Sequence, residues 1–258
     1  MKLSALILTY NEEEMIEKCL KQLDFVDEII ILDQNSQDKT CQLAQKYTKK
    51  IFKTESQAFD DNRNTLAKMA KGDWLFYLDV DERIEKEAKI EIKKAIAEAK
   101  YQAYYFPRKN IIFGKWFKHT GFWPDYVPRL FKHNKLISWQ GRVHESPKID
   151  GKFGYLKTPI IHLTARNLSA MFSKTIRWAK VEAQLSYQAE HSKVTRLMIV
   201  KAIIFEFISR FFIKRGFLDG VVGLVESIYQ AFHRAIILTY LWELQNDVKI
   251  KSKKFQYQ

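Results

Sequence analysis

Two aspartates separated by one residue are the first candidates for chemistry in this chain of 258 residues. Asp79 and Asp81 directly follow the apolar run Trp-Leu-Phe-Tyr-Leu, which has the composition of a buried strand. Carboxylates spaced in this way beyond a strand end can converge on one hard divalent cation, and that cation can bridge the phosphates of a nucleotide. A solvated acidic turn is the alternative for an isolated pair, because so short a motif is common.

The elements that must position these aspartates follow from the apolar pattern of the first hundred residues. Short apolar runs alternate there with segments of helical periodicity, which predicts a mostly parallel sheet covered by helices. The predicted strands are residues 3–8, 28–32, 50–52 and 74–78, and the predicted helices are residues 12–23, 39–47 and 60–71. Ligands of such sheets bind beyond the carboxyl ends of the strands, so we expect a site where the polar stretches after these strands meet.

Polar residues follow two further predicted strands. Thr9 and Glu12 lie after the first strand, and Asp33 ends the second. A carboxylate at Asp33 can accept a hydrogen bond from the N–H of uracil and would reject bases that lack this donor, which favours a uridine nucleotide. Asp38, just before the second helix, is interpreted as a simple N-cap, because Cys41 stands where a capping box needs Glu or Gln.

Four segments in this order resemble the family 2 glycosyltransferases of the GT-A fold. The segments are Leu6–Glu12, Ile31–Thr40, the pair Arg63-Asn64, and Asp79-Val80-Asp81. The resemblance implies a metal-dependent glycosyltransferase with a Rossmann-like α/β domain, a mostly parallel sheet and a helical C-terminal extension. The nucleotide-sugar contacts that it implies are Thr9, Glu12, Asp33, Arg63 and Asp79. The metal ion that it implies, Mg²⁺ or Mn²⁺, would be held by Asp81 and Asp79.

The second half of the chain resembles a narrower group, the bacterial lipopolysaccharide core β-1,4-glucosyltransferases. The matching segments are Arg129-Leu130-Phe131, Trp139–Glu145 and Gly216–Leu224. This resemblance implies an inverting transfer of glucose from UDP-glucose to a lipopolysaccharide inner core or another lipid-linked saccharide. A glycosyltransferase of the same fold that acts on a protein or another polysaccharide would show the same donor motifs.

No motif identifies the base on the acceptor side, because the chain lacks the Glu-Asp pair that marks this residue in the wider family. Residues 101–180 contain three carboxylates, and an inverting transfer needs one of them to take the proton from the acceptor hydroxyl. We select Glu145 as the catalytic base, with a structural ion pair to Arg142 or a lysine as the alternative role. Asp125 is the second choice, and Asp150 before Gly151 is interpreted as a turn residue.

Three further residues have more than one interpretation. His144 and His162 are each a candidate metal ligand, a partner for the leaving phosphate or a structural imidazole, and a lone histidine beside apolar residues is more often structural. Arg177 is a candidate for contact with the diphosphate, through its forked guanidinium, or for packing.

Composition and charge limit the class of protein and the domains that the chain can form. The composition is that of an ordinary globular protein, and the two cysteines, Cys19 and Cys41, predict neither a disulfide framework nor a zinc site. Residues 101–180 carry 15 basic side chains against three acidic ones, which favours an anionic ligand or surface. We expect a catalytic domain at 1–165, with a donor half at 1–100 and an acceptor half at 101–165. A helical extension at 166–247, interrupted near Arg215, and a basic tail at 248–258 follow.

The helical extension is apolar and basic together, which suits a helix lying on an anionic membrane surface; packing against the catalytic domain or a second subunit is the alternative. Lys201, Glu206 and Arg210 interrupt its most apolar stretch, so no membrane-spanning helix is predicted. The first residues are interpreted as a strand and not as a signal peptide. These points predict a cytoplasmic enzyme that binds peripherally to the cytoplasmic face of the inner membrane. They are compatible with a monomer or an oligomer.

Two other function classes compete. A sugar-phosphate nucleotidyltransferase would need a Gly-rich basic loop after the first strand, where this chain has Thr-Tyr-Asn-Glu-Glu-Glu. A nucleic-acid-binding protein would use the basic and aromatic residues of 101–180, but the first hundred residues are acidic and no nucleic-acid partner is expected.

Overall fold

The computed structural model describes residues 1–56, 58–141, 145–165 and 168–246, and the predicted tail at 248–258 lies outside them. The chain divides into two compact units. Unit 1 comprises Met1–Lys118 and Phe122–Thr164, and unit 2 comprises His119–Gly121 and Ala165–Gln258. Unit 2 therefore includes three residues from the interior of the sequence of unit 1.

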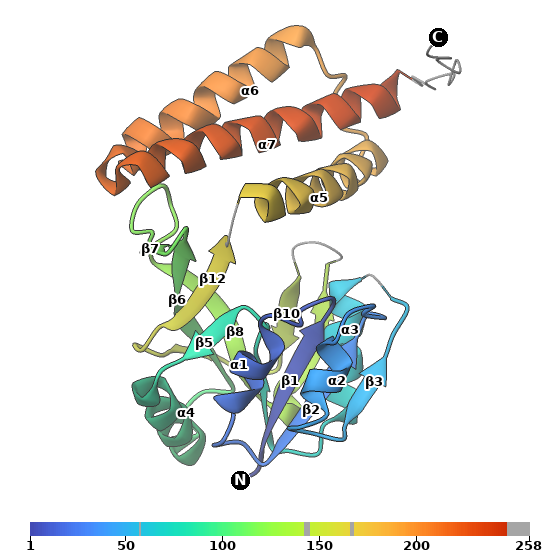
Figure 1. The fold of residues 1–258 in the computed structure, drawn as a ribbon, viewed down its shortest axis with the longest axis vertical. Coiled ribbons are helices and arrows are strands. Elements are labelled where there is room, and N and C mark those ends of the chain that lie inside the picture. Colours follow the sequence, from blue (N-terminus) through green and yellow to red (C-terminus); the bar gives the residue numbers. More distant parts are fainter. Residues whose placement is uncertain (57, 142–144, 166–167, 247–258) are drawn as a thin grey trace. The chain divides into compact units, whose positions relative to one another are not determined.

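The first four strands of unit 1 form the parallel part of a ten-stranded sheet, in the order β3-β2-β1-β4 (Figure 1). They are β1 (Leu3–Thr9), β2 (Glu28–Asp33), β3 (Ile51–Lys53) and β4 (Trp74–Tyr77). The helices between them are α1 (Ile16–Lys21), α2 (Thr40–Ala44) and α3 (Phe59–Met69). The elements predicted for this part are confirmed, although α1 and α2 are shorter than the periodicity predicted.

Strand β1 is buried on both faces, and its side chains alternate between two hydrophobic cores. Leu3, Ala5 and Ile7 pack in the core that includes the buried residues of α1. Leu6 points to the opposite face and packs in the core that includes Leu66 of α3. The apolar run thus fixes β1 in the centre of the sheet, with the polar residues that follow it at the carboxyl edge.

The remaining strands make the sheet mixed. Strand β8 runs antiparallel to β4, β6 runs antiparallel to β8, and β12 runs antiparallel to β5. Short loops, and not crossover helices, connect most strands after α4, and short connections produce antiparallel pairs. The bounds are β5 (Glu82–Ile84), α4 (Lys86–Glu98), β6 (Ala103–Ile112), β7 (Lys115–Trp116), β8 (Asp125–Lys132), η1 (His133–Lys135), β9 (Leu136–Gln140), β10 (Ser146–Ile149), β11 (Phe153–Tyr155) and β12 (Ile160–Ala165). The predicted α/β class is confirmed, and its parallel arrangement holds for β1 to β4.

Unit 2 is helical. Its elements are α5 (Leu168–Gln188), α6 (Arg196–Ile208), η2 (Ser209–Ile213), η3 (Gly216–Asp219) and α7 (Val221–Gln245). The predicted interruption is confirmed at Arg215, whose φ of 56° places it in the left-handed region. A second break between α5 and α6 was not predicted.

The glycines of the Gly216–Leu224 segment allow close backbone packing. A Cβ atom on Gly223 would lie 1.9 Å from the carbonyl oxygen of Gly216, so α7 can pack on η3 only without a side chain there. Asp219 of the same segment accepts hydrogen bonds from the backbone N–H of His119 and pairs with its Nδ1, both at 3.0 Å. This segment therefore binds the loop residues His119–Gly121 into unit 2.

Helix α7 is long and apolar enough, by length and composition, to cross a membrane. No membrane-spanning helix was predicted from the sequence, where the apolar stretch considered was that of α6. One third of the relevant window of α7 is buried inside the protein, and its buried residues include Glu226 and Ser227.

Candidate active site

The turn between β4 and β5 gathers carboxylates against two arginines. Asp79 Oδ1 accepts a hydrogen bond from Arg63 Nη2 at 3.3 Å, and its Oδ2 accepts one from Arg129 Nη2. The same nitrogen of Arg129 donates to Oε1 of the fully buried Glu82 at 2.6 Å, and Glu82 Oε2 accepts from the backbone N–H of Asp79 at 3.0 Å. Asp79 is thus fixed by side-chain and backbone contacts together.

Electrostatics keep this cluster ionised. Burial would raise the pKa of Asp79, but the guanidiniums of Arg129, Arg63 and Arg108 outweigh burial and hold it well below its usual range. Burial would lower the pKa of Arg129, but Asp79 and Glu82 outweigh burial and hold it above its usual range. Asp79 is therefore a permanent negative charge at neutral pH and does not act as a proton acceptor there.

Arg63 joins Asp79 to the predicted base. Its Nε donates to Glu145 Oε1 at 3.0 Å. The guanidinium lies over the ring of Trp139 at 4.8 Å and over the ring of Tyr77 at 5.5 Å, and the Tyr77 hydroxyl donates to the Arg63 carbonyl oxygen at 3.0 Å. An arginine this buried and stacked is held in one orientation. Glu145 is ion-paired, but with Arg63 and not with the lysine or Arg142 that were considered; Arg142 lies outside the described residues.

The neighbouring Asn64 explains how α3 is aligned with the two-stranded sheet of β9 and β10. Asn64 Nδ2 donates to the carbonyl oxygen of Trp139 at 2.9 Å, and Asn64 Oδ1 accepts from the N–H of Trp139 at 2.7 Å. The Arg63-Asn64 pair therefore places one side chain in the charged cluster and uses the other to dock β9.

A second chain of polar contacts reaches Asp81 from β6, β8 and β12. Asp125 Oδ2 accepts from Arg108 Nε at 2.8 Å and Nη2 at 2.7 Å, and from Asn110 Nδ2 at 3.1 Å. Asn110 Oδ1 lies 2.7 Å from His162 Nδ1, and His162 Nε2 lies 3.3 Å from Asp81 Oδ2. Strand β12 delivers the histidine, because it pairs with β5 in a register that sets His162 opposite Glu82.

The loops after β1 and β2 are tied together. Thr9 and Asp33 are register partners, and the N–H of Gln34 donates to the Thr9 carbonyl oxygen at 2.9 Å. Asp33 is fully buried, and its oxygens accept from the N–H of Ser36 at 2.9 Å and from the Ser36 hydroxyl at 2.5 Å. Ser36 Oγ also accepts from the N–H of Asn11 at 2.8 Å. Asp33 therefore organises the loop that follows β2.

Two hydroxyl groups, those of Thr9 and Thr40, lie in or next to these loops. The Oγ1 of Thr9 is buried and has no hydrogen-bond partner among the described residues. The N–H of Glu12 donates to Thr40 Oγ1 at 2.7 Å. Asp38 lies one residue before the N-cap position, Lys39, so the N-cap interpretation is corrected, but its Oδ1 does accept from the N–H of Thr40 at 3.0 Å.

The structure brings together most of the residues singled out from the sequence. Asp79, Arg63 and Glu145 lie in one ion-paired chain, and Asp81 lies beside His162. Asp150 is ion-paired with Lys135 at 2.6 Å, away from this chain. His144 and the side chain of Arg177 lie outside the described residues.

Sequence reasoning gave no role to four residues of the network: Glu82, Arg108, Asn110 and Arg129. Arg129 was noticed only as part of a motif. Glu82 had a usable signal, since it directly follows the Asp79-Val80-Asp81 turn. Arg108 and Asn110 are two residues apart on β6, so strand periodicity could have shown that their side chains share one face of the sheet.

A divalent cation fits this donor set. The described residues contain no group of three or more His, Cys, Asp or Glu side chains placed to hold a metal ion. Mg²⁺ in nucleotide sites is held by one or two carboxylates together with substrate phosphates, so a full protein cage is not needed. Asp81 Oδ2 and His162 Nε2 supply an oxygen and a nitrogen ligand 3.3 Å apart.

Comparisons with known proteins give the following similarities. The family model described as "Glycosyl transferase family 2" matches residues 4–163. An uncharacterized glycosyltransferase of Rickettsia conorii is 26% identical, over 94% of this chain and 90% of its own length. The SPbeta prophage-derived glycosyltransferase SunS of Bacillus subtilis is 29% identical, over 55% of this chain and 33% of its own. The crystal structure of S. aureus TarS 1–349 superposes with a TM-score of 0.48 at 16% identity, covering 96% of this chain and 91% of that chain.

Proposed function

Because the chain belongs to glycosyl transferase family 2, with a GT-A fold, we propose that it transfers glucose from UDP-glucose to a lipid-linked saccharide with inversion. The observation that carries the proposal is the pairing of Asp81 with His162 beside an arginine-bound Asp79, all at the carboxyl end of β4. A cation bound there would lie next to fixed guanidiniums, and this combination of charges would suit a nucleoside diphosphate.

The donor would be held by groups from several elements. We assign Asp81 and His162 to a Mg²⁺ or Mn²⁺ ion, which when bound stabilises negative charge on the diphosphate. Both oxygens of Asp79 are bound to arginines, so we assign Asp79 to orient Arg63 and Arg129 toward the phosphates.

The nucleoside would lie along the loops after β1 and β2. Thr9, whose hydroxyl has no partner in the described part of the chain, and Glu12 remain the candidate contacts. Asp33 has no exposed surface, so we assign it to hold the loop of Ser36, against which the uracil would lie.

In the transfer step, the acceptor oxygen forms a bond to the anomeric carbon as the bond from that carbon to the diphosphate oxygen breaks. We assign the proton of the acceptor hydroxyl to the carboxylate of Glu145, and UDP leaves on the opposite face of the sugar. Arg63 contacts both Glu145 and Asp79, so the base and the phosphate-binding charges are positioned by one side chain. Asp125 is the weaker candidate, because one oxygen accepts three hydrogen bonds from Arg108 and Asn110.

The acceptor is proposed from the resemblance of the second half to the lipopolysaccharide core glucosyltransferases, and a protein or another polysaccharide is the alternative acceptor. The basic residues of 101–180 would suit an acceptor that carries phosphate. We also propose that the enzyme works on the cytoplasmic face of the inner membrane, where a lipid-linked acceptor would be presented.

The donor proposal is tested by the thermal stability of the purified protein with Mn²⁺ and a panel of UDP-, GDP- and dTDP-sugars, because a ligand that binds the folded state raises its melting temperature. We expect the largest increase with UDP-glucose, and no increase in the Asp81→Asn variant. An equal response to all three nucleotides, or none, would reject the assigned donor. Transfer assays with lipid-linked and protein acceptors then separate the two acceptor classes.

A further inference from the structure

Helix α6 turns an apolar stripe outward, unlike an ordinary surface helix. Leu197, Val200, Ile204 and Ile208 recur at three- and four-residue spacing and are exposed, with Leu197 60% exposed. Glu206 lies on the opposite side, toward α7. A surface helix of a protein in water normally turns its polar face outward, so the solvent-facing stripe of α6 calls for another environment.

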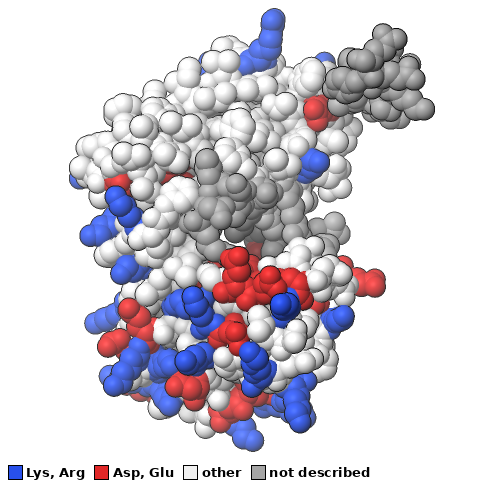
Figure 2. Space-filling model, viewed as in Figure 1, with Lys and Arg blue, Asp and Glu red and all other residues white. Residues whose placement is uncertain are grey.

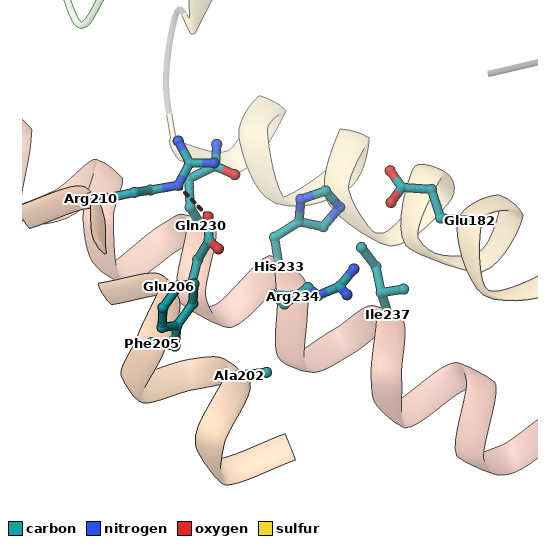
Figure 3. A pocket seen from close by; sticks show the side chains of 9 residues that line it. All are labelled: Glu182, Ala202, Phe205, Glu206, Arg210, Gln230, His233, Arg234 and Ile237. Carbon is teal, nitrogen blue, oxygen red and sulfur yellow. Dashed lines mark hydrogen bonds and ion pairs between the residues drawn. The ribbon is translucent and has the colours of Figure 1, made fainter. Parts of the chain in front are cut away.

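Several polar side chains of unit 2 line a pocket between its helices. Glu206 of α6, Arg210 of η2, His233 of α7 and Glu182 of α5 line a pocket of about 440 Å³ (Figure 3). Glu206 and Arg210 form an ion pair there, drawn as a dashed line in the figure. The ion pair of Glu206 with Arg210 thus lies at this pocket, whereas the apolar stripe of α6 is exposed.

The apolar stripe continues beyond α6. Phe212 and Ile213 of η2 follow it and are exposed. The term docking face is used below for six exposed apolar residues: Leu197, Val200, Ile204, Ile208, Phe212 and Ile213. In Figure 2, charged side chains of both signs are spread over unit 1, whereas the face of unit 2 in view is largely uncharged.

The exposed charges beside the docking face have one sign. Lys201, Lys214 and Arg215 are exposed, and no acidic side chain pairs with them in the part of the chain that the structure describes. Every acidic residue between 196 and 232 is occupied or buried. Glu206 is bound to Arg210, Asp219 to His119, and Glu226 is 2% exposed. The surface therefore offers apolar and cationic groups together and has no exposed acidic side chain in this segment.

We propose that this docking face lies on an anionic lipid bilayer, with α6 in the plane of the interface. The apolar side chains would enter the boundary between headgroups and acyl chains, and the three cations would contact anionic headgroups. A second copy of the chain fits less well, because a symmetric contact would bring these cations together. A spanning α7 fits less well too, because it would place Glu226, Gln230 and His233 in hydrocarbon.

Vesicle flotation with the full chain tests the proposal without any donor or acceptor, so its outcome is independent of the catalytic proposal. We expect binding to vesicles that contain phosphatidylglycerol and weak binding to pure phosphatidylcholine. Replacing Lys201, Lys214 and Arg215 with Gln should weaken partitioning onto anionic vesicles by about a hundredfold, at roughly 1 kcal/mol for each cation.

The apolar part is tested with the variant Ile204→Asn/Ile208→Asn/Phe212→Asn. Its matched control is Ile90→Asn/Ile137→Asn, which changes two exposed apolar residues of unit 1. We expect flotation to be lost in the first variant and kept in the second, with unchanged melting temperatures for both. Equal binding to neutral and anionic vesicles, or retained binding in the first variant, would overturn the proposal. A dimer in solution that the first variant abolishes would favour a second copy, and resistance of the bound protein to alkaline carbonate would favour a spanning helix.

Discussion

The side chain of Asn110 fixes the proton on one ring nitrogen of His162. Asn110 Nδ2 faces Asp125 Oδ2 at 3.1 Å and the carbonyl oxygen of Phe122 at 3.3 Å, both of which are acceptors. The amide oxygen must then face His162 Nδ1, at 2.7 Å, so that nitrogen donates. In the neutral ring, Nε2 carries the lone pair and presents it toward Asp81.

This relationship predicts that Asn110→Ala weakens metal activation. Without the amide, the ring is free to turn and to change tautomer, and loss of such a support typically lowers metal affinity by about 10- to 100-fold. The Mn²⁺ concentration for half-maximal transfer should rise accordingly, while kcat at saturating Mn²⁺ changes less. The exposed Asn134→Ala serves as the control and should leave the Mn²⁺ dependence unchanged. A Mn²⁺ dependence equal to that of the wild type would reject the positioning role of Asn110.

A second prediction separates the two candidate bases. Glu145→Gln should lower kcat by about 10²- to 10⁴-fold, because the acceptor hydroxyl then loses its proton acceptor. Asp125→Asn should act through Asn110 and His162, so it should alter the Mn²⁺ dependence more than kcat at saturating metal. Steady-state kinetics of both variants decide the assignment. The reverse pattern would make Asp125 the base.

A third prediction concerns the buried ion pairs. Arg129→Met should destabilise unit 1 by about 3–5 kcal/mol, because it leaves the fully buried Glu82 without its closest cation. Denaturant unfolding of the wild type and the variant measures this difference. The double variant Arg129→Met/Glu82→Gln should recover part of it, because no unpaired charge then remains on Glu82. A loss below about 1 kcal/mol in the single variant would show that the pair is not essential to the fold.

A fourth prediction follows from the depressed pKa of Asp79. The stability that its ion pairs contribute should be complete above the ordinary pKa of 3.8 and lost as pH falls through the lower pKa of the folded state. The free energy of unfolding of the wild type should therefore exceed that of Asp79→Asn at neutral pH. This difference in the free energy of unfolding should disappear only in strong acid. A gap that closed between pH 5 and 7 would contradict the assigned shift.

A fifth prediction concerns Glu226, whose pKa is raised to about 6 by burial. The folded state then holds a proton more tightly than the unfolded state, so stability should fall as pH rises from about 4.5 to 6. Glu226→Gln should remove this pH dependence and raise the free energy of unfolding at pH 7, because no buried carboxylate then has to lose its proton. Thermal unfolding as a function of pH checks it, with the exposed Glu190→Gln as control. An unchanged pH profile in the variant would assign the dependence to another group.

The sequence predicted the parallel half of the fold well, because its strands are apolar runs and its helices have clear periodicity. The residues at the carboxyl ends of β1, β2 and β4 followed directly from that pattern. Arg129, Asn110 and His162 did not, because antiparallel pairing between distant strands brings them to Asp79 and Asp81. Single polar residues on such strands have no periodic signature, and strand register over long sequence separations is not encoded locally.

The outward apolar stripe of α6 could not be predicted from the sequence either. The apolar and basic composition of this segment was visible, but which of its faces meets α7 depends on tertiary packing. Glu206 and Arg210 were read only as interruptions of an apolar stretch, and the structure shows them paired with each other.

The loop His119–Gly121 packs with the helical residues of unit 2, so unit 2 is built from two separate stretches of the sequence. Thr120 donates its N–H to the carbonyl oxygen of Lys214 at 2.9 Å and accepts from Arg210 Nη1 at 3.2 Å through its own carbonyl oxygen. A protease that cut the chain near residue 165 would therefore leave this noncovalent tether between the two fragments. A recombinant C-terminal piece would in turn lack the partner that Asp219 binds, so fragment complementation would require the tripeptide to be supplied with the N-terminal piece.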